Sequence, residues 1–595
     1  MAADTSLVEK LDALVVDILA DWNIYTTLVA GAVVAFAVYS VISAKDPDVH
    51  PFLLARQSTA APIRQQGESA TYRCLETPHG LPLRFGLNVK DPGAPKWTGG
   101  RRGDLRDIWK TAVRGALNED GTLSGKQGKI YTVLGRKAIE HSLDQVTQEI
   151  NVIGHHLQNS GVKTVAVCLT DSIELLATIF AGAFYGFKTV IVPHNLPAET
   201  LSAHLQQAKA EVLIAEAGSL DVSAAAKGND QLTLVLWVAK YGNRHMDWNA
   251  LPENVKDSLK VAVWHELVEE FKELASYDVP EYDPKTETPA VSTVWPSSSQ
   301  SGQFIDFQPE NLVSAIGAIT STLPRTQRFN PTDIVLSIDS LSRSYPLCTT
   351  LAALFANSSI ALNSVAGESV DFALATAGVS PTVIIASSQT MAEYHKNIMR
   401  PHTGILASLG RWLQARTLDA GNMPTRNFFS QLARVSPTSE LSLDDVRLLC
   451  ISHRIHGNPA AHLTSEQLTE LRIFTGARVV YALTGPGVAG AIAQTNAFDY
   501  RCLTGPSHFG APLSSTEITL TNVPEDSPDG TEEGQVCHAQ FHHFHIKLTF
   551  ASSSLSLALL LSAAQLLFPA EPASARTTPW NYLPERVNTQ NGRLK

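Results

Sequence analysis

The first long apolar segment of the chain covers Ile24 to Ala44 and carries no charge in 21 positions. At the helical rise per residue it would extend about 30 Å, which is the thickness of the hydrocarbon core of a bilayer. Trp22, Tyr25 and Tyr39 lie near its two ends, where aromatic rings favour the membrane interface. The pattern predicts a transmembrane helix over residues 24–44.

Two other interpretations of this segment stay open. A cleaved signal peptide would have a basic start and a shorter apolar run, whereas the residues before this run are acidic. A helix buried in a soluble protein is the second alternative. Lys45, Arg56 and Arg64 follow the run, so the positive-inside rule predicts that the body of the protein faces the cytosol. The bilayer is therefore an expected partner, at the endoplasmic reticulum or the mitochondrial outer membrane, with the peroxisome also open.

Further along, segments with helical and strand-like spacing of apolar residues alternate. Ala138 to Asn159 has helical spacing, and the β-branched run Lys163 to Leu169 follows it. Helical spacing returns at 172–185 and 198–208, and strand-like runs return at 189–193, 212–215, 333–337, 359–362, 382–386, 446–450 and 478–481. Strands that alternate with helices at this spacing are typical of parallel α/β architecture.

Composition excludes some classes of function. The chain has 595 residues and a formal net charge of −11, and its basic residues are scattered. Neutralising phosphates needs a basic stripe, so we expect no nucleic-acid partner. The six cysteines lie far apart and form no C-x-x-C pair, which fits reduced thiols better than a disulfide framework.

The character of the chain changes near Phe541. Four histidines crowd together there, at His538, His542, His543 and His545, but they lack a helical i, i+4 pair with a helper carboxylate, so we predict no metal site. An uncharged run over 551–568 could be a second membrane segment, an interfacial helix or a helix packed on the body. The polar end that follows has no periodicity and predicts disorder.

The sequence around Val294 resembles the signature loop of adenylate-forming enzymes, T-S-G-T-T-G-x-P-K-G, which follows a strand and precedes a helix that opens with x-N-L. The stretch here is V-W-P-S-S-S-Q-S-G-Q-F-I-D-F-Q-P-E-N-L. Aligned on Asn311 and Leu312, it places Ser298 and Ser299 on the paired threonines and Gln303 on the lysine. Three glycine positions are taken by Ser297, Gln300 and Phe304. Glycines let backbone N–H groups wrap phosphate oxygens, and the lysine adds a positive charge, so this loop has lost both advantages.

Further motifs of the same family follow in order. The run from Val479 to Gly485 resembles Y-G-L-T-E, keeping Tyr481 and Thr484 and placing Gly485 where the family has an acidic metal ligand. Weaker matches are Asp333 to Ser337 with Asp339 to Ser342, Pro381-Thr382, Gly510 to Pro512 and Gly534 to Val536. The later Y-R-T-G-D segment and the lysine-bearing C-terminal domain have no counterpart here. His50 to Ser58 is similar to the long-chain acyl-CoA synthetase branch.

The resemblance implies an adenylate-forming fold with two parallel-type α/β subdomains and a small β region. It divides the chain into an N-terminal segment 1–23, the membrane helix 24–44, a linking region 45–130, an AMP-binding domain 131–540 and an atypical tail 541–595. It also implies ATP and Mg²⁺ as cofactors, and fatty acid and CoA as small-molecule partners. By resemblance, Ser298, Ser299 and Gln303 would lie at the phosphate, Tyr481 beside adenine, and Thr484 near the phosphate or metal.

Three hypotheses for function follow. The first is a membrane-anchored long-chain fatty acid–CoA ligase in which Arg325, Arg328 or Arg343 replaces the lost positive charge. The second is a catalytically inactive pseudoenzyme that binds an acyl group or nucleotide, or serves as a scaffold at a membrane. The third is a sequence altered by a misread exon boundary or truncation after Cys537, which would explain the missing C-terminal domain but not the altered loop. Loss of the lysine, of the glutamate and of the ribose-binding aspartate would each remove about a few kcal/mol of transition-state stabilisation. Removal of one oxyanion-hole donor has an effect of this order.

Overall fold

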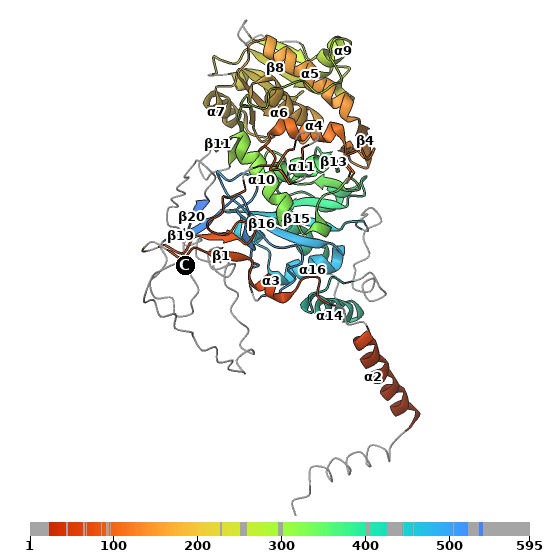
Figure 1. Ribbon diagram of the computed structural model, residues 1–595. Coiled ribbons are helices and arrows are strands. Elements are labelled where there is room, and N and C mark those ends of the chain that lie inside the picture. The colour runs from red at the N-terminus through yellow and green to blue at the C-terminus, as the bar shows by residue number, and fades with distance from the viewer. Residues whose placement is uncertain are drawn as a thin grey trace, which may run out of the picture.

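The structure is a computed structural model, and it contains three sheets (Figure 1). It describes residues 23–42, 46–63, 66, 68–84, 86–90, 94–95, 97–118, 120–226, 229–249, 259–295, 302–399, 405–424, 443, 445–455, 457–503, 505–521 and 535–539. The predicted tail 541–595 and the histidines after His538 lie outside these residues.

The first sheet has seven strands in the order β11-β10-β6-β5-β7-β8-β9, all parallel except the β10–β11 hairpin. Its strands are β5 (Thr164–Cys168), β6 (Lys188–Ile191), β7 (Val212–Glu216), β8 (Leu234–Val238), β9 (Lys260–Val263), β10 (Val291–Trp295) and β11 (Gln303–Phe307). The central strands β5, β7 and β8 are near-continuous apolar runs because helices cover both faces. These helices include α5 (Leu143–Asn159), α6 (Ile173–Tyr185), α7 (Ala198–Ala208), α8 (Val222–Ala226) and α9 (Trp264–Phe271).

The second sheet has nine strands in the order β18-β17-β16-β15-β14-β12-β13-β3-β4 and is parallel from β16 to β3. Its strands are β3 (Ile130–Leu134), β4 (Lys137–His141), β12 (Ile334–Ser337), β13 (Ser359–Asn363), β14 (Val383–Ser387), β15 (Leu448–Arg454), β16 (Arg478–Thr484), β17 (Ala493–Gln494) and β18 (Ala511–Pro512). Its helices are α10 (Pro309–Thr322), α11 (Ser344–Phe355), α12 (Phe372–Thr376), α13 (Ser388–Tyr394), α14 (Ile405–Asp419) and α16 (Ser465–Thr475). Together the two sheets confirm the predicted α/β fold with parallel sheets.

A small antiparallel sheet joins the two ends of the described chain. It contains β1 (Ser58–Ala60), β2 (Tyr72–Cys74), β19 (Ile518–Thr521) and β20 (Gln535–Ala539). The region before residue 130 also supplies α3 (Pro51–Ala55) and α4 (Leu105–Arg114). Helix α4 is buried between the two large sheets, where the Trp109 indole N–H donates to the Thr147 hydroxyl at 3.0 Å and its ring lies 4.7 Å from that of Phe180. The region before residue 130 therefore contributes to the common core.

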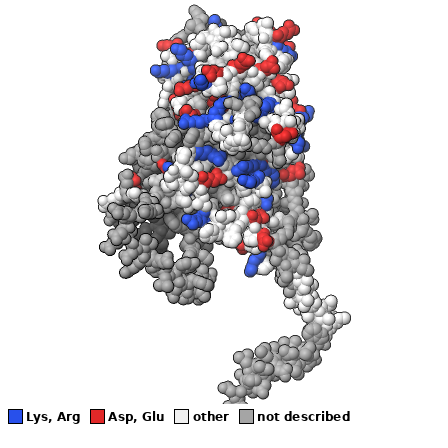
Figure 2. Space-filling model, viewed as in Figure 1, with Lys and Arg blue, Asp and Glu red and all other residues white. Residues whose placement is uncertain are grey.

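Helix α2 (Ile24–Ile42) extends away from the body, and its described surface shows no charged atoms (Figures 1 and 2). Ile24, Tyr25, Leu28 and Val29 are each more than 60% exposed. Within the described residues, no helix has both the length and the hydropathy needed to cross a membrane. The predicted transmembrane helix 24–44 is therefore not supported. The observed helix ends at Ile42, and its 19 residues rise about 28 Å, slightly less than a hydrocarbon core.

Candidate functional site

The resembling loop joins β10 to β11 at the end of the hairpin. Residues 291–295 pair with 303–307 in antiparallel register, so Trp295 lies opposite Gln303. Helix α10 begins at Pro309 as expected, and the Asn311 side chain accepts from the Gln308 N–H at 3.0 Å. Ser298 and Ser299 lie outside the described residues. Gln303 is an exposed strand residue paired across the hairpin.

Phe304 packs against the core beside the seven-stranded sheet. Its ring lies edge-on to that of His204, with centroids 5.3 Å apart. The resemblance placed this residue on a glycine of the phosphate loop. In the structure it belongs to β11, so the hairpin continues through positions where the family pattern has loop glycine and lysine.

Tyr481, in the middle of β16, lies in an aromatic cluster with His453, His462 and Phe509. Its ring centroid is 4.7 Å from that of Phe509, and the His453 and His462 rings are stacked 5.0 Å apart beside them. The Leu463 N–H donates to the Tyr481 hydroxyl at 3.2 Å. Burial lowers the pKa of His453 to about 3, with His462 and Arg454 adding to the effect, so His453 is neutral. The residue expected beside adenine is thus enclosed by the protein's own rings, at 0% exposure.

Thr484 is the last residue of β16, and Gly485 follows it. The Thr484 hydroxyl was expected near the phosphate or metal. In the structure it donates its hydrogen bond to the His453 carbonyl oxygen at 3.0 Å. A Cβ at Gly485 would lie 2.8 Å from Ile492 Cδ1 and 3.4 Å from Ile455 Cδ1. The position of the lost acidic metal ligand is therefore surrounded by methyl groups, which do not stabilise a carboxylate or a divalent cation.

Two arginines face the hairpin, and one glutamate holds both. The Arg343 Nη2 atom lies 2.7 Å from Glu368 Oε2, and Arg454 also pairs with the Glu368 carboxylate. Arg343 Nη1 lies 3.1 Å from the fully buried Asp339. Burial raises the pKa of Asp339 above its usual value, and the positive charge of Arg343 opposes that shift. We name these four residues (Asp339, Arg343, Glu368 and Arg454) the ion-pair cluster.

The ion-pair cluster and the hairpin leave little space between them. The cavity there has a volume of about 20 Å³, and its lining includes Trp295, Arg343, Arg454, Thr484 and Gly485. Small-molecule sites are commonly about 300 Å³ or larger. Among the described residues, no group at this edge offers both the space and the unpaired positive charge that a triphosphate needs. The described residues at this edge do not fit ATP with Mg²⁺ in the arrangement observed.

The comparisons with known proteins agree with the architecture. A model of the AMP-binding enzyme family matches residues 125–291. The chain has an adenylate-forming fold. The uncharacterized protein YHR045W of Saccharomyces cerevisiae is 22% identical over 496 residues, which cover 76% of this chain and 77% of that protein.

Solved structures with this fold are similar in shape but distant in sequence. The acetoacetyl-CoA synthetase of Streptomyces lividans matches with a TM-score of 0.51 and 13% identity, over 78% of this chain and 64% of that one. The anthranilate CoA ligase AuaEII in complex with anthranoyl-AMP matches with a TM-score of 0.49 and 14% identity, over 76% and 73%. The match to the acetoacetyl-CoA synthetase therefore shows a similar fold in this chain.

The sequence predicted the strands and helices around the β10–β11 hairpin but not the side-chain contacts between them. Of the three arginines considered as replacements for the lost lysine, only Arg343 lines the small cavity. Arg325 lies in a short 3₁₀ turn, and Arg328 donates to the Leu323 carbonyl oxygen at 3.3 Å. Arg454 was not predicted as a replacement for the lost lysine. The only clue in the sequence was its position shortly after the strand-like run Val446 to Cys450.

Proposed function

We propose that this chain is a membrane-attached protein derived from fatty acid–CoA ligases that keeps the adenylate-forming fold without forming adenylates. The observation that carries the proposal is the ion-pair cluster, in which Glu368 holds both arginines that face the hairpin. A carboxylate in this position repels the phosphates of a nucleotide. Acyl adenylation requires the opposite arrangement, in which positive groups hold a triphosphate in line with the attacking carboxylate.

The alternative is an active ligase in which Arg343 and Arg454 exchange Glu368 for phosphate. One observation favours it, because both arginines line the cavity beside the hairpin. This would require Glu368, whose side chain is 31% exposed, to turn away and remain charged in solvent. The rearrangement would also have to enlarge the cavity, since about 20 Å³ holds a single water rather than a nucleotide.

Adenylation is tested by acyl-dependent pyrophosphate release from the full chain with ATP, Mg²⁺ and a panel of fatty acids. We expect no release above the rate without fatty acid, and no rise in melting temperature when ATP is added, because a ligand that binds the folded state stabilises it. An Arg454→Gln variant serves as the matched control. Release that depends on fatty acid and disappears in this variant would establish the ligase alternative and overturn the proposal.

Membrane attachment is the second part of the proposal. Its support is the uncharged, exposed surface of α2, since contiguous apolar surface of this kind is rare on soluble proteins unless it meets a lipid or a partner. We expect the full chain to float with phosphatidylcholine vesicles in a density gradient. The double variant Leu28→Glu, Val33→Glu places two charges on the exposed surface and should reduce flotation at least about tenfold, given about 2.5 kcal/mol or more per charge in an apolar medium. Unchanged flotation of this variant would exclude attachment through α2.

A further inference from the structure

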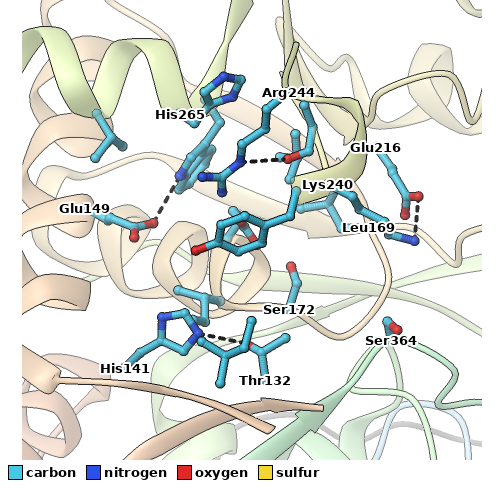
Figure 3. Close-up of a pocket in the computed structure, with 18 of the residues that line it drawn as sticks. Thr132, His141, Glu149, Leu169, Ser172, Glu216, Lys240, Arg244, His265 and Ser364 are labelled. Carbon is cyan, nitrogen blue, oxygen red and sulfur yellow. Dashed lines mark hydrogen bonds and ion pairs between the residues drawn. The ribbon is translucent and has the colours of Figure 1, made fainter. Parts of the chain in front are cut away.

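A second and much larger cavity lies away from the hairpin, between the two large sheets. Its volume is about 340 Å³. One wall is formed by the residues that follow β5, β7 and β8 and by helices α5 and α9. The opposite wall comes from the β3–β4 hairpin and from Ser364, which follows β13 (Figure 3). This volume lies within the range of small-molecule sites.

The topology of the seven-stranded sheet explains why a cavity forms here. The chain runs from β5 to β6 on one side and then returns to β7 on the other side of β5. The connections at the carboxyl ends of these strands therefore diverge in opposite directions. In open parallel sheets, ligands bind in the crevice that this divergence leaves at the carboxyl ends.

An acidic corner lies at the α5 side of the cavity. The Trp264 indole N–H donates to Glu149 Oε2 at 3.1 Å, and the negative charge of Glu174 acts on the same carboxyl group. Burial, with Glu174 adding to it, raises the pKa of Glu149 to about 7, against the opposing effects of Trp264 and Arg244. Glu149 thus holds a proton near neutral pH at a place where an ammonium group would be stabilised by two carboxylates.

A basic group also lines the cavity. Arg244 donates from Nε to the Ala239 carbonyl oxygen at 3.4 Å, and its guanidinium lies over the Tyr241 ring at 4.1 Å from the centroid (Figure 3). Lys240, which also lines the cavity, is paired with Glu216 at 2.6 Å. In the described part of the chain, no carboxylate lies within ion-pair distance of Arg244. Its terminal nitrogens are therefore the donors best suited to a ligand carboxylate.

We propose that this cavity binds a small zwitterion of the amino-acid class, with its ammonium group between Glu149 and Glu174 and its carboxylate on Arg244. Because carboxylates and an arginine line the same cavity, such a ligand is favoured over a simple fatty acid or a simple amine. Within the described residues, no group of three or more metal-ligating side chains is present, so a cation site does not explain the acidic corner.

The pH dependence follows from the proton on Glu149. An ammonium group displaces that proton, so affinity should rise as pH increases through about 7 and should become constant above it. Burial lowers the pKa of the two histidines of the cavity, His141 and His265. The titratable and charged groups that line the cavity with Glu149 are His141, Asp171, Glu174, Glu216, Lys240, Tyr241, Arg244, His265, Glu269 and Lys272. Asp171 also has a pKa raised to about 8 by burial, but its carboxylate accepts from the Ser340 hydroxyl and the Leu341 N–H, which follow β12.

Calorimetric titration of the full chain with the twenty amino acids and with 4-aminobutyrate, butylamine and butyrate tests the proposal. We expect at least one zwitterion to bind with a Kd below about 1 mM, and butylamine and butyrate to bind at least about tenfold more weakly than 4-aminobutyrate or the best amino acid. Arg244→Gln should weaken the zwitterion at least about tenfold and leave butylamine unchanged. Glu149→Gln should remove the rise in affinity between about pH 6 and about pH 8.

Tyr241→Phe is the matched control, because it keeps the ring beside Arg244 and both charged sides of the cavity. A thermal melt of each variant verifies that it is folded before binding is compared. Absence of binding by every zwitterion at about 10 mM, or equal binding by butyrate and the best zwitterion, would overturn the proposal. These outcomes are independent of pyrophosphate release, since no residue of the ion-pair cluster lines this cavity.

Discussion

Replacement of Asp333 by alanine is expected to lower the free energy of unfolding by about 3–5 kcal/mol, which is typical when one partner of a buried charged pair is removed. The carboxylate is 2% exposed and joins three strands of the nine-stranded sheet. It accepts from Arg447 Nε and Nη2 at 2.8 and 2.7 Å and from the Thr382 hydroxyl at 2.8 Å. The Asn330 N–H and side-chain amide donate to it at 2.9 and 2.8 Å. Alanine would leave the Arg447 charge without its carboxylate.

Urea unfolding followed by far-UV circular dichroism measures this loss. Glu140→Ala is the matched control, because Glu140 forms an exposed pair with Lys129 at the edge of the same sheet. Removing an exposed pair should change the free energy of unfolding by no more than about 1 kcal/mol. A loss below about 1 kcal/mol for Asp333→Ala would show that the hydrogen bonds around Asp333 do not hold the sheet together.

Substitution of Gly510 by alanine is the second change with a large expected effect, about 3–4 kcal/mol from strain and overpacking together. The residue has a φ of 77°, and a Cβ there would lie 2.2 Å from the Gln494 carbonyl oxygen and 2.5 Å from Thr495 Cα. Both contacts are with backbone and cannot be relieved by rotating a side chain. The β17–β18 pairing, in which Gln494 lies opposite Ala511, would have to open.

Gly505→Ala separates the two causes of this effect. Gly505 has a φ of 94°, but nothing lies within 4 Å of a Cβ at that position. It should therefore show only the backbone strain, about 1–2 kcal/mol. The measurement is again the urea midpoint and slope for each variant. Equal losses for the two substitutions would mean that the contact with Gln494 relaxes at little cost.

The elements of the fold could be predicted because apolar spacing is a local property of the sequence. The expected helix 198–208 is α7, with the same bounds, and the expected strand 212–215 lies within β7. The helix that opens near Asn311 was also found. In each of these segments the apolar residues recur at the spacing typical of the helix or strand that forms, and their burial in the core agrees with that spacing.

The contacts at the functional edges could not be predicted in the same way. Glu368 meets Arg343 and Arg454 across 25 and 86 positions of sequence, and no local pattern links the three. Gln303 and Phe304 were placed in a loop by alignment, whereas hydrogen bonding with β10 places them in a strand. Glu149 and Arg244 come from different elements, so the large cavity is visible only after the sheet has formed.

Asp171 joins the two cavities through a single turn of chain. Its carboxylate lines the larger cavity and accepts from the Leu341 N–H at 3.0 Å, while Arg343, two residues further on, belongs to the ion-pair cluster. The seven-stranded and nine-stranded sheets are therefore fastened at their carboxyl ends by a buried polar tie, and a relative rotation of the two would have to break it.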